Sequence, residues 1–294
     1  MADPTPSDFD ERFHTTRDGL RLFCRDYPGP TPAGVIALCL HGLTRNSRDF
    51  EDLAPRLACA RRVLCLDVRG RGRSARDPEP THYVPSTCAH DVLELLDEAG
   101  IARVAVIGTS MGGILALLLA ALRPAALAGV VLNDIGPEID PKGIARIASY
   151  VGRTLDVASW EGAAESMRAL NAPAFPDFAR ADWLRFARRT FREEADGRLR
   201  PDYDSAIGEG TRGGSAVPAD LWPLFGLLQT IPALVIRGAL SDILSEVTLA
   251  KMAKAKPDLE ILRVANRGHA PTLDEPECVA AIERFLLRIS ASSF

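Results

Sequence analysis

The chain has 294 residues, of which 47% are hydrophobic, and this is enough to fill the core of one large α/β domain with an inserted subdomain. Lys and Arg total 35 against 39 Asp and Glu, so the net charge of −4 excludes the strongly basic surface that binds nucleic acids or anionic membranes. Because the amino-terminal residues lack a basic segment followed by an apolar one, we expect no signal peptide and a cytoplasmic protein.

The predicted elements alternate between strands and helices. Residues 9–15 and 20–26 form an antiparallel pair with a tight turn at Asp18 and Gly19. The alternation that follows predicts a mostly parallel, doubly wound sheet covered by helices on both faces. The further predicted strands are 35–40, 62–67, 104–107, 127–132, 233–237 and 259–264, and the main helices of this part are 49–60, 85–99, 114–122 and 276–289.

The cysteines and histidines are scattered along the chain. None of the six cysteines forms a C-x-x-C pair, and several lie in apolar segments such as ALCL and VLCL, so we expect reduced thiols in the core. The five histidines form neither an H-E-x-x-H motif nor a cluster with cysteines, so we expect no metal site.

The segment 104–122 has no charged residue and is about as long as a transmembrane helix. Its centre, GTSMGG, contains small and turn-forming residues that an uninterrupted helix would not contain. The residues before the centre are β-branched and short, whereas those after it are rich in Leu and Ala. The segment therefore predicts a buried strand, a sharp turn and a buried helix.

Ser110 lies at the centre of this turn, in the G-x-S-x-G pattern of a nucleophile elbow. A chain that passes from strand to helix within one residue brings the positions two before and two after it close together, and Gly108 and Gly112 occupy these positions. The serine hydroxyl would then lie at a helix amino terminus, where backbone N–H groups favour negative charge.

Between residues 137 and 218 the pattern changes, because few segments there favour strands. Helices are expected over about 143–151, 156–170 and 180–194. We therefore predict a core domain formed by residues 1–136 and 219–294, with an inserted helical cap over residues 137–218.

Ser110, Asp242 and His269 each follow a predicted strand, in this order along the chain. The carboxyl ends of parallel strands meet at one edge of a sheet, where ligands bind, so these side chains are expected to come together. A serine hydroxyl is a weak nucleophile near neutral pH, so catalysis by Ser110 requires a base to take its proton.

These motifs resemble those of the α/β-hydrolase superfamily, and the resemblance extends from HG at 41–42 through DVRGRGRS, GTSMGG and RGALSDIL to GHAPTLDEP. It implies that Ser110 is the nucleophile, His269 the general base and acid, and Asp242 the residue that orients the imidazole. It also implies an oxyanion hole formed by the backbone N–H groups of Leu43 and Met111.

Other residues compete with some of these assignments. Asp134 also follows a strand, and some α/β-hydrolases place the triad acid there, so it is the alternative to Asp242. Ser241 is expected to be a turn residue, Asp67 to brace or cap its loop, and His41 to brace the loop before Leu43 through hydrogen bonds.

Four residues are candidate substrate contacts. Arg45 lies two residues past Leu43, where a guanidinium could bind a substrate carboxylate or simply remain solvated. Trp160 and Trp183, together with Phe186, could line a pocket beneath the cap, although aromatic residues on helices are more often part of a core.

The function predicted on this basis is a serine hydrolase that cleaves a small to medium carboxylic ester or lactone through an acyl-enzyme, with a small-molecule substrate and no cofactor. A serine at position 110 disfavours epoxide hydrolases and haloalkane dehalogenases, whose nucleophile is an aspartate. Carbon–carbon bond hydrolases, cofactor-free perhydrolases or haloperoxidases, amidases and lactonases remain open, as does a ligand receptor of the same fold.

Overall fold

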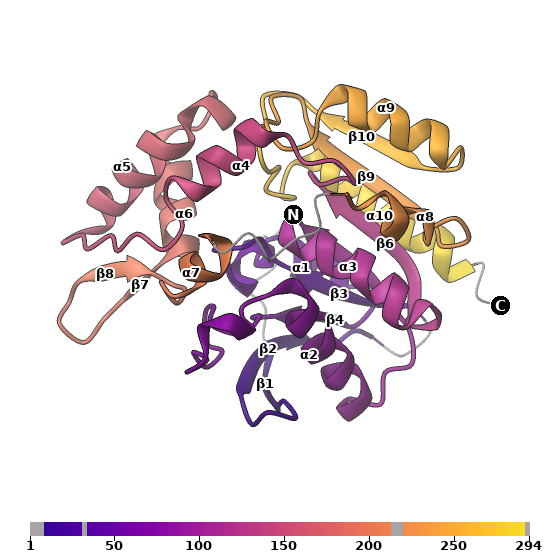
Figure 1. Cartoon of the computed structure of the whole chain (residues 1–294), viewed down its shortest axis with the longest axis horizontal. Coiled ribbons are helices and arrows are strands. Elements are labelled where there is room, and N and C mark those ends of the chain that lie inside the picture. The colour runs from indigo at the N-terminus through magenta and orange to yellow at the C-terminus, as the bar shows by residue number, and fades with distance from the viewer. Residues whose placement is uncertain (1–8, 31–33, 213–219, 292–294) are drawn as a thin grey trace.

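The computed structural model describes residues 9–30, 34–212 and 220–291. In this part of the chain a sheet has the strand order β1-β2-β4-β3-β5-β6-β9-β10 (Figure 1). The pairs β1–β2 and β2–β4 are antiparallel and the other neighbours are parallel, which confirms the predicted sheet. The strands are β1 Asp10–Thr15, β2 Arg21–Tyr27, β3 Ile36–Leu40, β4 Val63–Leu66, β5 Val104–Thr109, β6 Leu127–Asn133, β9 Ala233–Gly238 and β10 Glu260–Val264.

Helices cover both faces of the sheet because alternate side chains of each central strand enter different cores. Leu38 and Leu40 of β3 pack with α2, α3, α8 and α9, whereas Ala37 and Cys39 pack with α1 and α10. The helices on the sheet are α1 Leu53–Ala58, α2 Pro85–Glu98, α3 Met111–Leu122, α8 Trp222–Gly226, α9 Glu246–Ala255 and α10 Pro276–Ala291. Short 3₁₀ turns occur at Ser47–Phe50, Pro80–His82, Pro124–Ala126 and Ala172–Ala174.

The uncharged segment 104–122 is divided between β5 and α3, as predicted. All but three residues of α3 are buried, which explains why this helix is apolar on every side. Within the described ranges, no helix combines the length and apolar character needed to cross a membrane.

The chain from α4 to α7, between β6 and α8, forms a separate group of elements beside the carboxyl ends of the strands (Figure 1). Its own small core includes Phe175, Trp183 and Phe191. The elements are α4 Pro141–Ala148, α5 Trp160–Asn171, α6 Arg180–Thr190, β7 Phe191–Glu193, β8 Leu199–Pro201 and α7 Ile207–Arg212. We refer to this group as the cap. The predicted boundary at residues 218 and 219 lies outside the described residues, and the division into domains stays a prediction.

The predicted helix over 180–194 is wrong at its end. The helix α6 stops at Thr190, and β7 then pairs with β8 in an antiparallel hairpin. Gly197 in the hairpin turn has a φ of +75°, a conformation that glycine adopts without steric cost. The buried side chains of Phe191 and Leu199 join the cap core, and this tertiary packing stabilises the hairpin.

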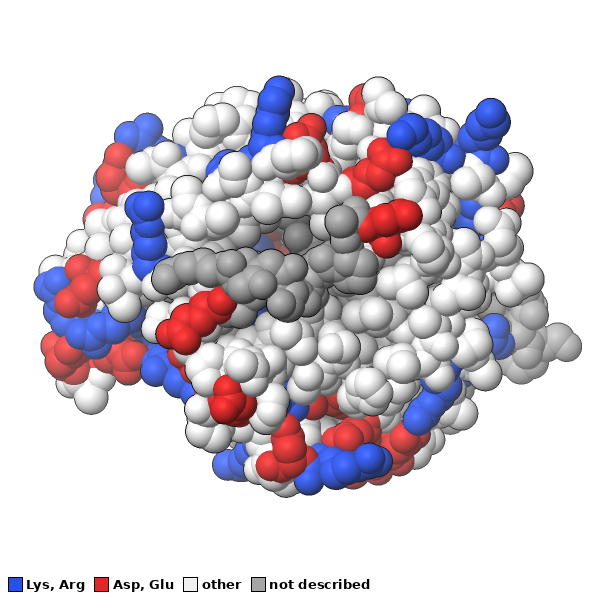
Figure 2. All heavy atoms as spheres, in the orientation of Figure 1, with Lys and Arg blue, Asp and Glu red and all other residues white. Residues whose placement is uncertain are grey.

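No disulfide joins the six cysteines, all of which lie in the described ranges; five are buried, as predicted for core residues, whereas Cys59 is exposed. Figure 2 shows acidic and basic side chains side by side on one face of the molecule, with broad uncharged areas between them.

Two glycines allow α3 to begin directly after β5. A Cβ atom at Gly112 would lie 2.0 Å from the carbonyl oxygen of Leu40, and a Cβ atom at Gly108 would lie 2.4 Å from the backbone of Gly112. Both contacts involve backbone atoms, which cannot move aside as a side chain can. The elbow therefore depends on glycine at both positions.

We predict that Gly112→Ala lowers the free energy of unfolding by about 2–4 kcal/mol, because the added methyl group must push α3 away from β3. Thermal and urea unfolding monitored by circular dichroism measure this loss. Gly226→Ala is the matched control, since a Cβ atom there meets nothing within 4 Å. Equal stability of the two variants would contradict the steric account.

Candidate active site

Ser110 occupies the elbow between β5 and α3. Its backbone angles are φ 51° and ψ −113°, a conformation that L-residues rarely adopt. The backbone around it is held from both sides, because Ser110 N–H donates to Asn133 O at 3.0 Å and Gly113 N–H donates to Ser110 O at 2.9 Å. The strained residue is therefore fixed at the amino terminus of α3.

His269 bridges Ser110 to a buried carboxylate. Its Nε2 lies 2.9 Å from Ser110 Oγ, and its Nδ1 lies 2.8 Å from Oδ2 of Asp134. A carboxylate can only accept, so Nδ1 carries the proton and Nε2 is left to accept the hydroxyl proton of Ser110. The arrangement can activate Ser110 as a nucleophile.

The carboxylate of Asp134 is completely buried and accepts two further hydrogen bonds. Gly238 N–H donates to Oδ1 at 2.9 Å, and Ser241 Oγ donates to Oδ2 at 2.6 Å. Both donors hold the carboxylate in the orientation in which Oδ2 faces His269. Sequence analysis predicted Ser241 only as a turn residue, because nothing in its neighbourhood indicates that its hydroxyl faces another strand's acid.

The prediction that Asp242 orients His269 is wrong in this structure. Asp242 instead forms a two-bond ion pair with Arg146 of α4, with distances of 2.5 Å to Nε and 2.8 Å to Nη2. Burial acts to raise the pKa of Asp242, but the pairing with Arg146 and the positive charge of a protonated His269 lower it below its usual value. Asp134, the alternative that the sequence left open, holds the place at Nδ1.

The backbone between His41 and Leu43 is fixed by buried hydrogen bonds. Val68 N–H donates to His41 Nε2 at 3.0 Å, so Nδ1 is the nitrogen that donates to Gly42 O at 2.8 Å. Arg45 N–H also donates to Gly42 O, at 3.1 Å. In a trans peptide the Leu43 N–H points opposite to Gly42 O, so these bonds fix its direction. The bracing role predicted for His41 is confirmed.

Burial lowers the pKa of His41 to about 4, so this imidazole is neutral at physiological pH. Asp67 braces the neighbouring loop as predicted. Its carboxylate accepts from Ser47 N–H at 2.6 Å and from Arg73 N–H at 2.8 Å, while burial raises its pKa to about 6.

The comparison with protein families gives one match, the family model described as the alpha/beta hydrolase fold, over residues 38–276. This match includes the elbow, His41 to Leu43, and both aspartates. The chain belongs to the α/β-hydrolase family.

Individual α/β-hydrolases match over nearly the whole chain. The 3-hydroxybutyrate-oligomer hydrolase of Cupriavidus necator is 31% identical, with 90% of this chain and 92% of that protein covered. The 2-(acetamidomethylene)succinate hydrolase of Mesorhizobium japonicum is 29% identical, with 86% and 88% covered. The crystal structure of an alpha/beta hydrolase from Novosphingobium aromaticivorans has a TM-score of 0.92 at 46% identity and covers 96% of this chain and 99% of that one. The protein is therefore a hydrolase of this family.

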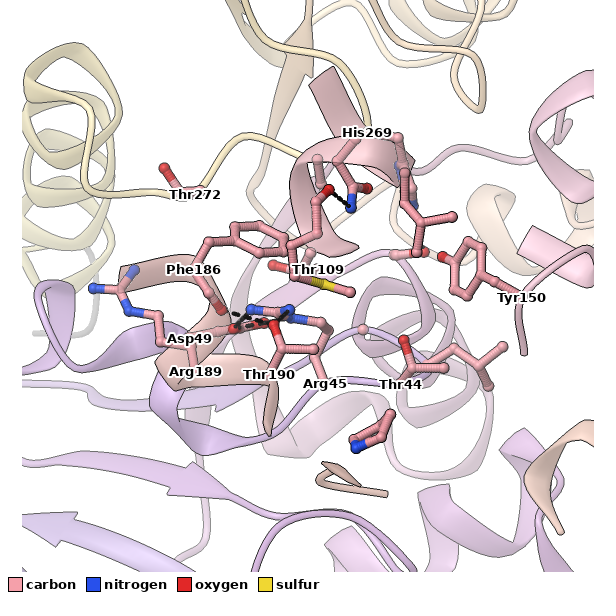
Figure 3. A pocket seen from close by; sticks show the side chains of 18 of the residues that line it. Thr44, Arg45, Asp49, Thr109, Tyr150, Phe186, Arg189, Thr190, His269 and Thr272 are labelled. Atoms are coloured by element: carbon pink, nitrogen blue, oxygen red, sulfur yellow. Dashed lines mark hydrogen bonds and ion pairs between the residues drawn. The ribbon is translucent and has the colours of Figure 1, made fainter. Parts of the chain in front are cut away.

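A cavity of about 370 Å³ lies between the core and the cap, with Ser110 and His269 in its wall (Figure 3). Its apolar lining comes mainly from the cap, and its hydroxyl groups come from both parts. The lining includes Leu43, Thr44, Thr109, Tyr150, Leu155, Met167, Leu170, Phe175, Phe186, Thr190, Tyr203 and Thr272. A cavity of this size suits a small ligand.

Arg45 lines the cavity, but its guanidinium already has protein partners. It bonds to both carboxylate oxygens of Asp49 and to the Thr190 hydroxyl, and it lies 4.4 Å from the ring centre of Phe186 (Figure 3). Asp49 therefore occupies the guanidinium fork, so Arg45 is neither simply solvated nor open to a substrate carboxylate, the two alternatives that the sequence left.

Neither Trp160 nor Trp183 is among the described residues that line the cavity. Trp183 is only 5% exposed and packs edge-on against Phe175 and Phe178 in the cap core. Trp160 lies under the guanidinium of Arg188, at 4.9 Å. The proposed substrate contacts at Trp160 and Trp183 are thus corrected to structural roles, whereas Phe186 does line the cavity.

We predict that Asp134→Asn slows labelling of Ser110 by a fluorophosphonate about 10²-fold or more. The amide no longer favours the tautomer of His269 in which Nδ1 carries the proton and Nε2 can accept one from Ser110. Asp242→Asn is the matched control and is expected to change the rate less than threefold, by roughly the effect of a partly exposed ion pair. Intact-protein mass spectrometry measures both rates. A slow Asp242→Asn beside a fast Asp134→Asn would reverse the assignment.

Proposed function

We propose that this protein is a serine hydrolase that cleaves carboxylic esters of short hydroxyacids through an acyl-enzyme intermediate. The observation that carries the proposal is the pair of hydrogen bonds at His269, 2.9 Å to Ser110 Oγ and 2.8 Å to Asp134 Oδ2. An imidazole held in this way by a carboxylate makes a serine hydroxyl reactive.

In the first half of the reaction, Ser110 Oγ attacks the ester carbonyl carbon and passes its proton to His269 Nε2. The carbonyl electron pair moves to oxygen and gives a tetrahedral oxyanion. As the electron pair returns, the bond to the alkoxide breaks and His269 donates its proton to the leaving alcohol. Asp134 remains ionised and stabilises the imidazolium, and the acyl group stays on Ser110.

In the second half, His269 takes a proton from water as the water oxygen attacks the acyl carbon. A second oxyanion forms and collapses, the bond to Ser110 Oγ breaks, and the proton returns to the serine. The N–H groups of Leu43 and Met111 are proposed to donate to both oxyanions. Removing one such donor typically costs about 2.7–4 kcal/mol of transition-state stabilisation.

The proposed substrate class is supported by the cavity and by a relative. A cavity of about 370 Å³ with apolar and hydroxyl-bearing walls has room for a few short hydroxyacid units. The relative from Cupriavidus necator is named for hydrolysis of 3-hydroxybutyrate oligomers. An oligomer of this kind consists of esters and ends in a free carboxylate.

Arg153 is our candidate for binding that carboxylate. Asp49 is the one acidic residue among the lining residues of the described cavity, and it is paired with Arg45. Arg189, also in the lining, is paired with Glu51 and Asp52. In the ranges that the structure describes, the exposed side chain of Arg153 has no such protein partner.

The first test is hydrolysis of p-nitrophenyl esters from acetate to decanoate and of the linear 3-hydroxybutyrate dimer, with Ser110→Ala as the control. We expect multiple turnovers with short acyl chains and with the dimer, and loss of turnover in the variant, because the acyl-enzyme cannot form. A wild-type chain without activity on any of these esters would overturn the proposal. Lactones, vinylogous diketones and ligand binding without turnover would then be examined.

The role of Arg153 is tested by comparing the dimer as a free acid with its methyl ester. We expect Arg153→Gln to lower kcat/KM for the free acid about fivefold and to change it less than twofold for the methyl ester, since only the acid presents a carboxylate. Arg188→Gln removes the same charge from an exposed residue outside the cavity lining and serves as the control. Equal losses on both substrates would remove Arg153 from the proposal.

A further inference from the structure

Arg71 is a buried cation whose hydrogen bonds do not go to carboxylates. Its side chain is in the loop that follows β4, and the residue is 1% exposed. Nε donates to Leu43 O at 2.9 Å, Nη1 donates to Arg69 O at 2.7 Å, and Nη2 lies 3.6 Å from Met111 Sδ. The carboxylate of Asp204, which is not among the hydrogen-bond partners of Arg71, accepts the Tyr83 hydroxyl at 2.7 Å.

The nearby buried Arg69 differs from Arg71 in its partners. Arg69, two residues earlier, is also 1% exposed but forms ion pairs with Asp77 and Asp91 and reaches Asp18. In the described part of the chain, no such ion pair is formed by Arg71. Burial lowers the pKa of Arg71, yet a guanidinium stays protonated in proteins. Its positive charge is thus held in the interior without an ion-pair partner. Burying such a charge lowers the stability of the fold.

Two of the contacts of the Arg71 side chain are with Leu43 and Met111, the residues that we propose to form the oxyanion hole. Leu43 and Met111 come from different parts of the chain, one after β3 and one at the start of α3. The guanidinium of Arg71 contacts the carbonyl oxygen of Leu43 and the side-chain sulfur of Met111. One rigid planar group therefore contacts both residues whose N–H groups are the proposed donors.

The loop that carries Arg71 is itself held by the cap. Gly72 N–H donates to Asp202 O at 2.9 Å, and Asp204 N–H donates to Gly70 O at 2.7 Å. The backbone of Arg71 pairs with that of Tyr203 in an isolated antiparallel β-bridge, and Tyr203 lines the cavity. The position of the guanidinium is consequently defined by backbone bonds to the cap as well as by its own side-chain bonds.

We propose that Arg71 is a positioning residue for the oxyanion hole, which holds the carbonyl of Leu43 in place and puts an unneutralised positive charge behind the negative oxygen of the tetrahedral intermediate. The inference rests on the proposed function. Fixing Leu43 O restricts rotation about the Leu43 backbone and so keeps its N–H directed as the bonds to Gly42 O require. The charge acts more strongly on the transition state than on the neutral substrate, because the oxygen becomes negative only there.

The test compares Arg71→Met and Arg71→Lys with Arg61→Met. Arg61 is a suitable control, because it is 4% exposed and donates to Val35 O and Leu286 O, at the opposite end of β3 from Leu43. Each variant is examined by circular dichroism and thermal unfolding. The readouts are kcat and KM on the best p-nitrophenyl ester, and the affinity for an alkyl boronic acid, which Ser110 converts into a tetrahedral anion.

For Arg71→Met we expect kcat to fall about 10²-fold with KM changed less than threefold, and the boronic acid affinity to fall by a similar factor. Arg71→Lys restores part of both losses by returning the charge. Arg61→Met lowers the melting temperature but leaves kcat and boronic acid affinity within twofold.

A folded Arg71→Met that keeps the wild-type kcat and boronic acid affinity would overturn the inference and leave the proposed function standing. Equal losses of kcat in Arg71→Met and Arg61→Met would also overturn it, since the effect would then follow from stability. A wild-type chain without Ser110-dependent ester turnover would overturn the proposed function itself, together with the inference.

Discussion

The site depends on the close packing of α3 against the end of β3. Gly112 lies so near the carbonyl of Leu40 that a single methyl group would not fit between them. Met111 directly precedes Gly112, and His41 to Leu43 directly follow Leu40. One backbone contact therefore sets the distance between the elbow, which carries the N–H of Met111, and the loop that carries the N–H of Leu43, and glycine makes that distance possible.

The acid that bonds to His269 is held in place by residues at the ends of two neighbouring parallel strands. The strands β6 and β9 are adjacent, and both end at the same edge of the sheet. Asp134 at the end of β6 reaches His269, while Gly238 and Ser241 at the end of β9 donate to its carboxylate. This leaves Asp242 free to pair with Arg146, so the same region of β9 both supports the acid and joins the core to the cap.

Arginine ion pairs connect the cap to the core around the cavity. Arg189 of α6 pairs with Glu51 and Asp52 of the core, and Arg48 of the core pairs with Asp202 after β8. Partly buried pairs of this kind contribute less to stability than their Coulomb energy suggests, because both charges lose water. Their bonds do fix geometry, and the loop that carries Arg71 is positioned by the same cap segment.

The sequence by itself determined the features that are local in the chain. A strand, a turn and a helix within residues 104–122 were sufficient to predict the elbow at Ser110, because the required glycines lie two residues on each side. The parallel sheet, the strand ends that carry His269 and both aspartates, and the bracing by His41 also followed from short patterns.

The tertiary structure alone decided that Asp134, and not the Asp242 that the sequence motifs favoured, bonds to His269. Asp134 and Asp242 both follow neighbouring strands, and only the left-handed backbone of Asp134, with φ 56°, and the arginine that α4 presents to Asp242 separate their roles. The same holds for the contact of Arg45 with Thr190, which comes from the cap, whereas its other partner, Asp49, lies four residues later in the sequence. Side-chain partners far apart in sequence depend on how the elements pack, and periodicity and motif spacing do not encode that packing locally.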